Sequence, residues 1–127
     1  MNDLNGLINQ GLALHQSGRV VEALKVYERV LPMQRNNDEL LFIMGTACCQ
    51  IGDFEQGLNY LKKSTRVNPK NFHAFGNMGK LNADLGRFNE AVINYNKALQ
   101  IHPDFPEALL GRGNALLELG RVEDAIS

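Results

Sequence analysis

The chain has 127 residues, of which 44% are hydrophobic and 21% charged, and its 13 basic and 14 acidic residues give a net charge of −1. This composition indicates a folded protein, and the dispersed charge argues against nucleic acid or an anionic membrane as partner, because both require a basic face. No stretch approaches the roughly 20 apolar residues that span a bilayer. The N-terminus lacks the layout of a secretion signal, and adjacent cysteines such as Cys48 and Cys49 rarely form a structural disulfide. We therefore expect a cytoplasmic protein.

The sequence repeats with a period of 34 residues, as in LGRFNEA from Leu85 and LGRVEDA from Leu119. We place the start of each unit at Leu4, Asp38, Phe72 and Pro106. Glycine then occupies the eighth and the fifteenth position of every unit: Gly11, Gly45, Gly79 and Gly113, and Gly18, Gly52, Gly86 and Gly120. The twentieth position is always small: Ala23, Gly57, Ala91 and Ala125. A fixed period of this length indicates stacked supersecondary units.

Each unit predicts two helices in succession. Apolar residues recur at helical spacing before each fifteenth-position glycine, which we expect to end the first helix in the left-handed conformation. Proline ends the second helix at Pro69 and Pro103. In the first unit Pro32 comes three residues early, so we expect that helix to end or kink near Leu31. The small eighth and twentieth positions are expected to face each other between antiparallel helices.

The third unit carries a spaced set of seven residues: Phe75-x2-Met78-Gly79-x2-Asn82, Ala91-x3-Tyr95 and Pro103. This set resembles the tetratricopeptide repeat, whose pattern is W-x2-L-G-x2-Y, A-x3-F and P. The resemblance covers residues 4–127, as repeats at 4–37, 38–71, 72–105 and 106–127. It implies an all-α fold, a right-handed α-solenoid of antiparallel helix pairs.

The last repeat is expected to be truncated after its first helix, because the sequence given stops at Ser127, the twenty-second position of that unit. A solenoid normally ends in a helix with a polar outer face, and no such helix follows here. We therefore expect a piece of a longer protein. We also expect the apolar Leu109–Leu116 face to be covered by self-association, as a homo-oligomer through the uncapped C-terminal repeat.

The resemblance implies that the first helix of each repeat lines a concave groove that binds another protein or a peptide. The residues that we select for this groove are Asn9, Leu12, Phe42, Thr46, His73, Asn77, Lys80 and Asn114. The same assignment also places Gly76 and Gly111 on the groove. The selected surface mixes carboxamides with apolar groups and carries little charge.

One subfamily of the tetratricopeptide repeat holds the acidic C-termini of heat-shock chaperones with a clamp of lysines, an arginine and asparagines. In this chain Ile8, Leu12 and Ile43 stand at clamp positions, and only Asn77 and Lys80 could contribute. A chaperone-tail ligand is therefore disfavoured.

A second subfamily, the superhelical arm of O-linked N-acetylglucosamine transferases, carries a ladder of asparagines at the sixth position. This chain has Asn9 and Asn77 there, but Ile43 and Gly111 interrupt the ladder. A carboxamide can pair with a peptide backbone of any sequence. Because asparagine is also common on solvated helices, both a peptide-clasping role for Asn9, Asn77 and Asn114 and a purely solvated one stay open.

No catalytic or metal-binding constellation is predicted, and no cofactor is expected. The histidines His15, His73 and His102 fall in three units without metal-ligand spacing. His15 and Cys49 share the twelfth position of successive units, which leaves a two-ligand zinc site open, but ordinary packing explains them more simply. Cys48 is expected in the core, and Cys49 is expected to face the groove. We do not expect this chain alone to be an enzyme.

Two functions remain. The leading interpretation is a protein–protein interaction scaffold that binds an extended peptide or a partner helix in its groove. The alternative is the N-terminal substrate-recruiting arm of a larger enzyme, such as a glycosyltransferase similar to O-linked N-acetylglucosamine transferases.

Overall fold

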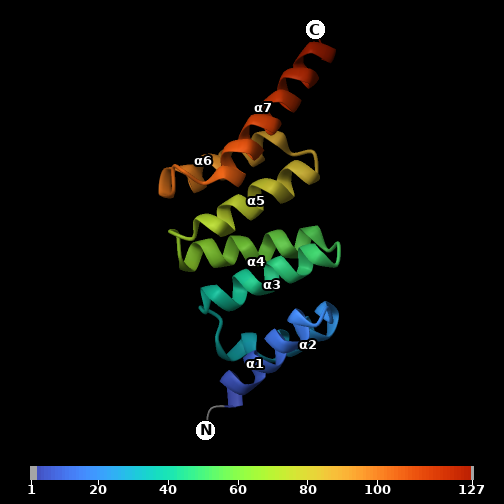
Figure 1. Cartoon of the computed structure of the whole chain (residues 1–127), viewed down its shortest axis with the longest axis vertical. Coiled ribbons are helices and arrows are strands. Elements are labelled where there is room, and N and C mark those ends of the chain that lie inside the picture. Colours follow the sequence, from blue (N-terminus) through green and yellow to red (C-terminus); the bar gives the residue numbers. More distant parts are fainter. Residues whose placement is uncertain (1–2, 127) are drawn as a thin grey trace. The chain divides into compact units, whose positions relative to one another are not determined.

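The computed structural model describes residues 3–126, with side chains for residues 4–121. Its elements are α1 (Asp3–Gln16), α2 (Val20–Val30), a short 3-10 turn η1 (Leu31–Met33), α3 (Asp38–Gln50), α4 (Phe54–Val67), α5 (Phe72–Asp84), α6 (Phe88–Ile101) and α7 (Pro106–Ile126) (Figure 1). Residues 3–126 contain no strand, so the predicted all-α class is confirmed. Across the same residues, no helix combines the length and the hydropathy that a membrane crossing needs.

The chain divides into two compact units, Met1–Val67 and Asn68–Ser127. In the first unit α1 packs against α2, and α3 packs against α4, with a smaller contact between α2 and α3. In the second unit α5 packs against α6, and α7 contacts both. Within each unit, successive helices run antiparallel, as Figure 1 shows for α3 with α4 and for α5 with α6. The predicted antiparallel helix pairs are therefore confirmed.

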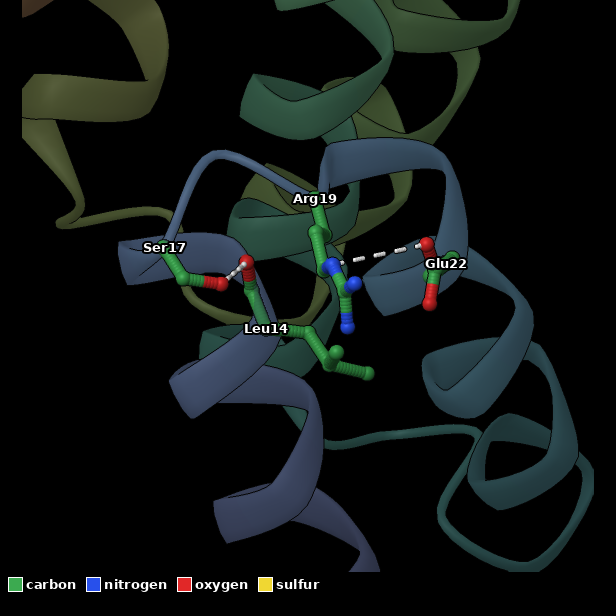
Figure 2. A network of polar contacts seen from close by, with 4 residues as sticks. All are labelled: Leu14, Ser17, Arg19 and Glu22. Carbon is green, nitrogen blue, oxygen red and sulfur yellow. Dashed lines mark hydrogen bonds and ion pairs between the residues drawn. The ribbon is translucent and has the colours of Figure 1, made fainter.

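The same turn follows the first helix of each of the first three repeats. Its glycine has a positive φ, at 88° in Gly18, 83° in Gly52 and 77° in Gly86. Figure 2 shows the first of these turns, where the Leu14 carbonyl accepts a hydrogen bond of 2.9 Å from the Ser17 hydroxyl. The same carbonyl accepts the backbone N–H of Arg19 at 2.9 Å. This closure of a helix end by a left-handed glycine is the arrangement predicted for the fifteenth position.

The eighth-position glycines allow close contact between the paired helices. A Cβ added to Gly11 would lie 2.5 Å from Cε1 of Tyr27, and one added to Gly45 would lie 2.8 Å from Cγ of Leu61. The prediction that the two small positions face each other holds for Gly45 and Gly57, since a Cβ on Gly57 would lie 3.0 Å from the Gly45 carbonyl oxygen. In the first and third repeats the prediction is incomplete, because the glycine is covered by a tyrosine ring four residues beyond the small position.

The second helix of the first repeat ends early, next to a proline that also comes early in the sequence. Helix α2 ends at Val30, and Leu31, Pro32 and Met33 form the 3-10 turn η1. Proline lacks the N–H that a continued α-helix needs. The predicted early end of this helix is confirmed.

The last helix differs from the prediction. We expected Gly120 to end it, but α7 runs from Pro106 to Ile126, and Gly120 has no positive φ. Gly113, the eighth residue of this repeat, has no atom within 4 Å of an added Cβ. In the first three repeats a side chain of the paired helix covers the eighth-position glycine. That contact is missing at Gly113, and the helix continues through Gly120. The side chain of Ala125, predicted to face Gly113, lies outside the described residues, as does Ser127.

Candidate functional site

A shallow hollow lies between α1 and α3 in the first unit. It has a volume of about 280 Å³ and is lined by six residues: Leu12, His15, Gln16, Phe42, Ile43 and Thr46. Three of the eight residues selected from the sequence, Leu12, Phe42 and Thr46, come together there, all half-buried. The stacking of two first helices thus creates a concave surface with a mainly apolar lining.

The rim of this hollow is polar and internally bonded. Nε2 of His15 donates a hydrogen bond of 2.6 Å to Oε1 of Gln50, an oxygen that can only accept. Nδ1 of the neutral imidazole then accepts the Tyr27 hydroxyl, at a longer 3.4 Å. His15 therefore links α1 to α2 and α3. These hydrogen bonds fit the ordinary packing role weighed for His15 against a zinc site.

The Thr46 hydroxyl is less available to a ligand than its position in the predicted groove indicates. The Thr46 hydroxyl donates to the Phe42 carbonyl one turn earlier, at 2.9 Å. Such back-bonding to the preceding turn occupies the hydroxyl proton. The carboxamide of Gln16, which lines the hollow, is exposed to solvent. On the same two helices Gln50 and, one turn before Leu12, Asn9 are exposed as well.

In the second unit, His73, Asn77 and Lys80 follow one side of α5, at helical spacing. His73 and Lys80 are exposed and Asn77 is half-buried. Asn114, on α7, is exposed as well. The structure therefore leaves these four residues accessible, and Lys80 is the one cation among the eight selected residues.

His73 belongs to an aromatic cluster that the sequence analysis missed. The Phe72 ring lies 4.3 Å from the His73 ring and 4.6 Å from the His102 ring, measured between centroids. Phe105 packs edge-on against both Phe72 and His73, at 5.2 Å and 5.4 Å. Two exposed imidazoles thus flank a partly buried apolar pair, at the start of α5 and before α7.

Three groove assignments made from the sequence are wrong. A Cβ on Gly76 would lie 2.7 Å from Cε2 of Phe105, and the ring of Tyr95 covers Gly111, so neither glycine faces an open groove. The third is Cys49, whose sulfur lies 2.9 Å from the position of a Cβ on Gly57, toward α4. A signal for Gly76 was present, because the fifth position holds a large apolar residue in every other repeat.

A second hollow of about 430 Å³ lies between α2 and α4 in the first unit. Its lining includes the acidic side chains Glu28, Asp53 and Glu55, the cation Lys25 and the thiol of Cys48. Cys48 is buried, as expected, and burial raises the pKa of its thiol to about 11, with smaller contributions from Asp53, Cys49 and Glu28. A thiol with so high a pKa is a poor nucleophile near neutral pH.

Among the described residues, no three histidine, cysteine, aspartate or glutamate side chains come close enough to hold a metal ion. What the two units offer is a set of concave or exposed helix faces with neutral polar groups and apolar patches.

Family models match most of the chain. Two models described as tetratricopeptide repeat match residues 7–39 and 38–71, and one described as TPR repeat matches residues 82–120. The chain belongs to the tetratricopeptide repeat family. This confirms the resemblance identified from the glycine and proline spacing.

Individual relatives are distant. The chain is 34% identical over 55 residues to the protein CTR9 homolog of Arabidopsis thaliana, a match that covers 43% of this chain and 5% of that protein. A crystal structure of the MamA protein has a TM-score of 0.90 at 21% identity, over 98% of this chain and 68% of that one. These tetratricopeptide matches establish the fold.

Two further structures bear on the alternatives left open by the sequence. The first TPR of Spaghetti (RPAP3), bound to the HSP90 peptide SRMEEVD, has a TM-score of 0.87 at 19% identity, over 92% of this chain and 93% of that one. The Thermobaculum terrenum O-GlcNAc transferase has a TM-score of 0.77 at 22% identity, over 89% of this chain and 22% of that one. At these identities the likeness is one of tetratricopeptide fold.

Proposed function

We propose that this chain is a non-catalytic scaffold that recruits another protein by binding an extended peptide segment on its first-helix faces. The observation that carries the proposal is the hollow between α1 and α3, whose lining is mainly apolar and includes Leu12, Phe42 and Thr46. Exposed carboxamides stand beside it and can pair with a peptide backbone irrespective of its sequence. An apolar side chain of the peptide then provides the anchor.

The charge of these faces argues against an acidic ligand. Anchoring a carboxylate requires several cations or N–H donors, and Lys80 is the single cation among the selected residues. Unlike the RPAP3 repeat, which holds SRMEEVD, this chain is expected to prefer peptides that are weakly charged and carry a leucine, methionine or aromatic residue.

A displayed library of random peptides, panned against the intact chain, tests this proposal. We expect enriched peptides to share an apolar anchor, and their affinity, measured by fluorescence anisotropy, to fall at least tenfold in Phe42→Asp. Ile93→Asp is the matched control, since Ile93 is exposed on α6 and does not line the hollow. SRMEEVD serves as the acidic probe and is expected not to bind.

Two results would contradict the proposal. One is the absence of any enriched peptide. The other is an enriched set whose affinity is the same in Phe42→Asp as in the parent chain. Asn77→Ala, compared with Asn89→Ala on α6, tests in the same way whether the α5 face takes part.

The alternative is that these repeats serve as the substrate-recruiting arm of a larger enzyme, plausibly a glycosyltransferase. The fold likeness to the Thermobaculum terrenum O-GlcNAc transferase and the carboxamides Asn9 and Asn77 favour it. The coding sequence downstream of codon 127 tests this idea. A nucleotide-sugar-binding catalytic domain in frame would support it, whereas a stop codon or further repeats alone would contradict it.

We also propose a cytoplasmic setting, which the two free thiols Cys48 and Cys49 favour. Finally, we propose that the chain self-associates through its last helix, α7, because leucines are exposed along it.

A further inference from the structure

A third hollow in the first unit is lined by cations without any acidic side chain. It lies between residues 31–36, the start of α3 and the end of α4, and it has a volume of about 330 Å³. Its lining consists of Leu31, Arg35, Asn36, Leu41, Lys63, Arg66 and Val67. Three of these seven described residues are cations and none is acidic. We call this site the basic hollow, because it concentrates positive charge in a chain whose net charge is −1.

The basic hollow also has an apolar part. Leu41 is buried, Leu31 is half-buried and Val67 is 40% exposed. All three cations are exposed. Ligand pockets typically combine a mainly apolar lining with a few polar groups, in volumes of roughly 300–1,000 Å³. At the lower end of that range, the basic hollow has room for a single large side chain and the groups next to it.

The basic hollow occurs where the first repeat departs from the repeat pattern. Helix α2 ends at Val30 and α4 ends at Val67, 37 residues apart rather than the 34 of the repeat. The connection that follows α2 is correspondingly longer. Within it, Arg35 stands at the position that Pro69 and Pro103 hold in the next two repeats. The early end of α2 therefore brings a cation to a place where the other repeats have a proline.

Hydrogen bonds hold both sides of the basic hollow. The residues on either side of Arg35 are joined twice: the Asn37 backbone N–H donates to the Gln34 carbonyl at 3.0 Å, and the Asn37 side chain donates to Oε1 of Gln34 at 2.8 Å. The Ser64 hydroxyl donates to the Asp38 carbonyl at 2.9 Å, which joins α4 to the start of α3. The backbone that carries the cations is thus fixed before a ligand arrives, which lowers the entropic cost of binding.

Two of the three cations have no partner in the chain. Neither Arg35 nor Arg66 forms a hydrogen bond or an ion pair with another side chain among the described residues. The Lys63 amine lies 5.8 Å from the centroid of the Tyr60 ring. Arg66 stands in the last turn of α4, where a cation complements the helix dipole. The dipole does not account for Arg35, which lies outside every described helix.

We propose that the basic hollow binds a segment of a partner protein in which one large apolar residue stands between acidic residues. The apolar side chain packs against Leu31, Leu41 and Val67. The flanking carboxylates pair with Arg35 from the loop and with Arg66 from α4, since a guanidinium can bind a carboxylate through two parallel hydrogen bonds. This site is separate from the hollow between α1 and α3 and has the opposite preference for charge.

Two other anionic ligands fit the basic hollow less well. In SRMEEVD the large apolar residue, methionine, follows an arginine and so lacks an acidic residue on one side. Anionic lipid surfaces are recognised by clusters of roughly four to eight basic residues, whereas three cations line this hollow. A short acidic and apolar segment of a protein is therefore favoured over a membrane.

A fluorescein-labelled peptide with blocked termini, GSDEFDESG, tests the site by fluorescence anisotropy with the intact chain. We expect it to bind at least tenfold more tightly than GSDESDESG, which lacks the apolar residue. Its affinity is expected to fall as salt is added, because exposed charges are screened. Replacing both arginines, as Arg35→Gln with Arg66→Gln, is expected to weaken binding at least tenfold. Arg29→Gln with Lys62→Gln is the matched control, since these two exposed cations of the same unit do not line the hollow.

Val67→Glu tests the same site without removing a cation. The new carboxylate stands beside the cations and competes with those of the peptide, so binding is expected to weaken at least tenfold. Val67 is partly exposed, so the fold should be retained, and circular dichroism checks this. Val21→Glu, which alters another exposed valine of the first unit, is the control and should bind like the parent chain.

Several results would overturn the proposal. One is that GSDEFDESG does not bind. Another is that the arginine variant and its control bind alike, since affinity then follows the overall charge alone. Binding of phosphatidylserine vesicles that depends on Arg35 and Arg66, with no binding of the peptide, would assign the basic hollow to a membrane instead.

Phe42→Asp separates this proposal from the peptide-binding function proposed above. Phe42 lines the hollow between α1 and α3 and not the basic hollow, so the affinity for GSDEFDESG is expected to stay unchanged in this variant. A loss in Phe42→Asp without a loss in the arginine variant would place the peptide between α1 and α3 and overturn the proposal. If instead no weakly charged peptide binds between α1 and α3 while GSDEFDESG still requires the arginines, the basic hollow stands and the other proposal fails.

Discussion

The ring of Tyr95 occupies the space that a side chain on Gly79 would need. A Cβ added to Gly79 would lie 2.7 Å from both Cδ1 and Cε1 of that ring. The same ring covers Gly111, so one buried tyrosine on α6 joins α5 and α7 through two glycines. The packing of the second unit therefore requires glycine at both positions, whatever its cost in helix propensity.

We expect Gly79→Ala to lower the free energy of unfolding by about 1–3 kcal/mol, because the ring must shift in a packed interior. In an open helix position the same change would raise stability by roughly 0.5–1 kcal/mol. Gly113→Ala supplies that comparison, since its Cβ would meet nothing within 4 Å. Urea denaturation followed by circular dichroism measures both. If the two variants shift the midpoint in the same direction, the assigned contact between α5 and α6 is wrong.

The glycines at the fifteenth position also differ in the expected effect of an alanine substitution on stability. Gly86 has a φ of 77°, a left-handed conformation that costs a residue with a Cβ roughly 1–2 kcal/mol. We therefore expect Gly86→Ala to destabilise by about that amount. Gly120 lies inside α7 without a positive φ, so Gly120→Ala should stabilise by up to ~1 kcal/mol. Thermal melts of the two variants check the pair; a loss in Gly120→Ala like that in Gly86→Ala would mean that α7 ends at Gly120 in solution.

Asn82 occupies a position where the other repeats have Leu14, Cys48 or Leu116. Its side chain is buried, and its Oδ1 has no hydrogen-bond partner among the described residues. A buried polar atom without a partner costs about 1–3 kcal/mol. We expect Asn82→Leu to raise the free energy of unfolding by about that amount. Asn89→Leu, at an exposed position on α6, is the control. A destabilised Asn82→Leu would indicate that an ordered water satisfies the amide.

Much of this fold could be predicted because its signals are local. Gly18, Gly52, Gly86 and Pro32 were each interpreted correctly from the local sequence. Gly120 was not, because α7 continues through it where the contact at Gly113 is missing. The partner of each eighth-position glycine could not be predicted, because it depends on how two helices rotate about their axes. In the structure, the partner is in each case the tyrosine or leucine that stands four residues after the twentieth position of the repeat.

Part of the candidate site could also be predicted from the sequence. Helical spacing was enough to bring Leu12, Phe42 and Thr46 onto one surface. It could not show that Phe105 covers Gly76, because that contact joins a loop to a helix 29 residues earlier. Nor could spacing show that the Thr46 hydroxyl bonds its own helix, since side-chain and backbone acceptors compete for it. Whether Asn9, Asn77, Lys80 and Asn114 bind a ligand stays a prediction.

Stability should fall in alkaline solution, well before the arginines titrate. Burial raises the pKa of the Cys48 thiol from 9.0 to about 11, and it raises the pKa of Tyr27, Tyr60 and Tyr95 above 10.0. Each of these groups is neutral when protonated, so the folded chain holds the proton more tightly than the unfolded chain. Their contribution is therefore complete below about pH 9 and is lost as the pH rises toward 11.

Urea midpoints measured from neutral pH to about pH 11 at constant ionic strength follow this loss. The midpoint is expected to stay level up to about pH 9 and then to decrease, because unfolding exposes groups that ionise more readily in water. Cys48→Val removes the thiol that ionises first on unfolding, so its midpoint should stay level to a higher pH than that of the parent chain. Tyr95→Phe should leave the onset unchanged and reduce the loss above about pH 10. A parent midpoint that is independent of pH over this range would show that these side chains are hydrated in the folded chain.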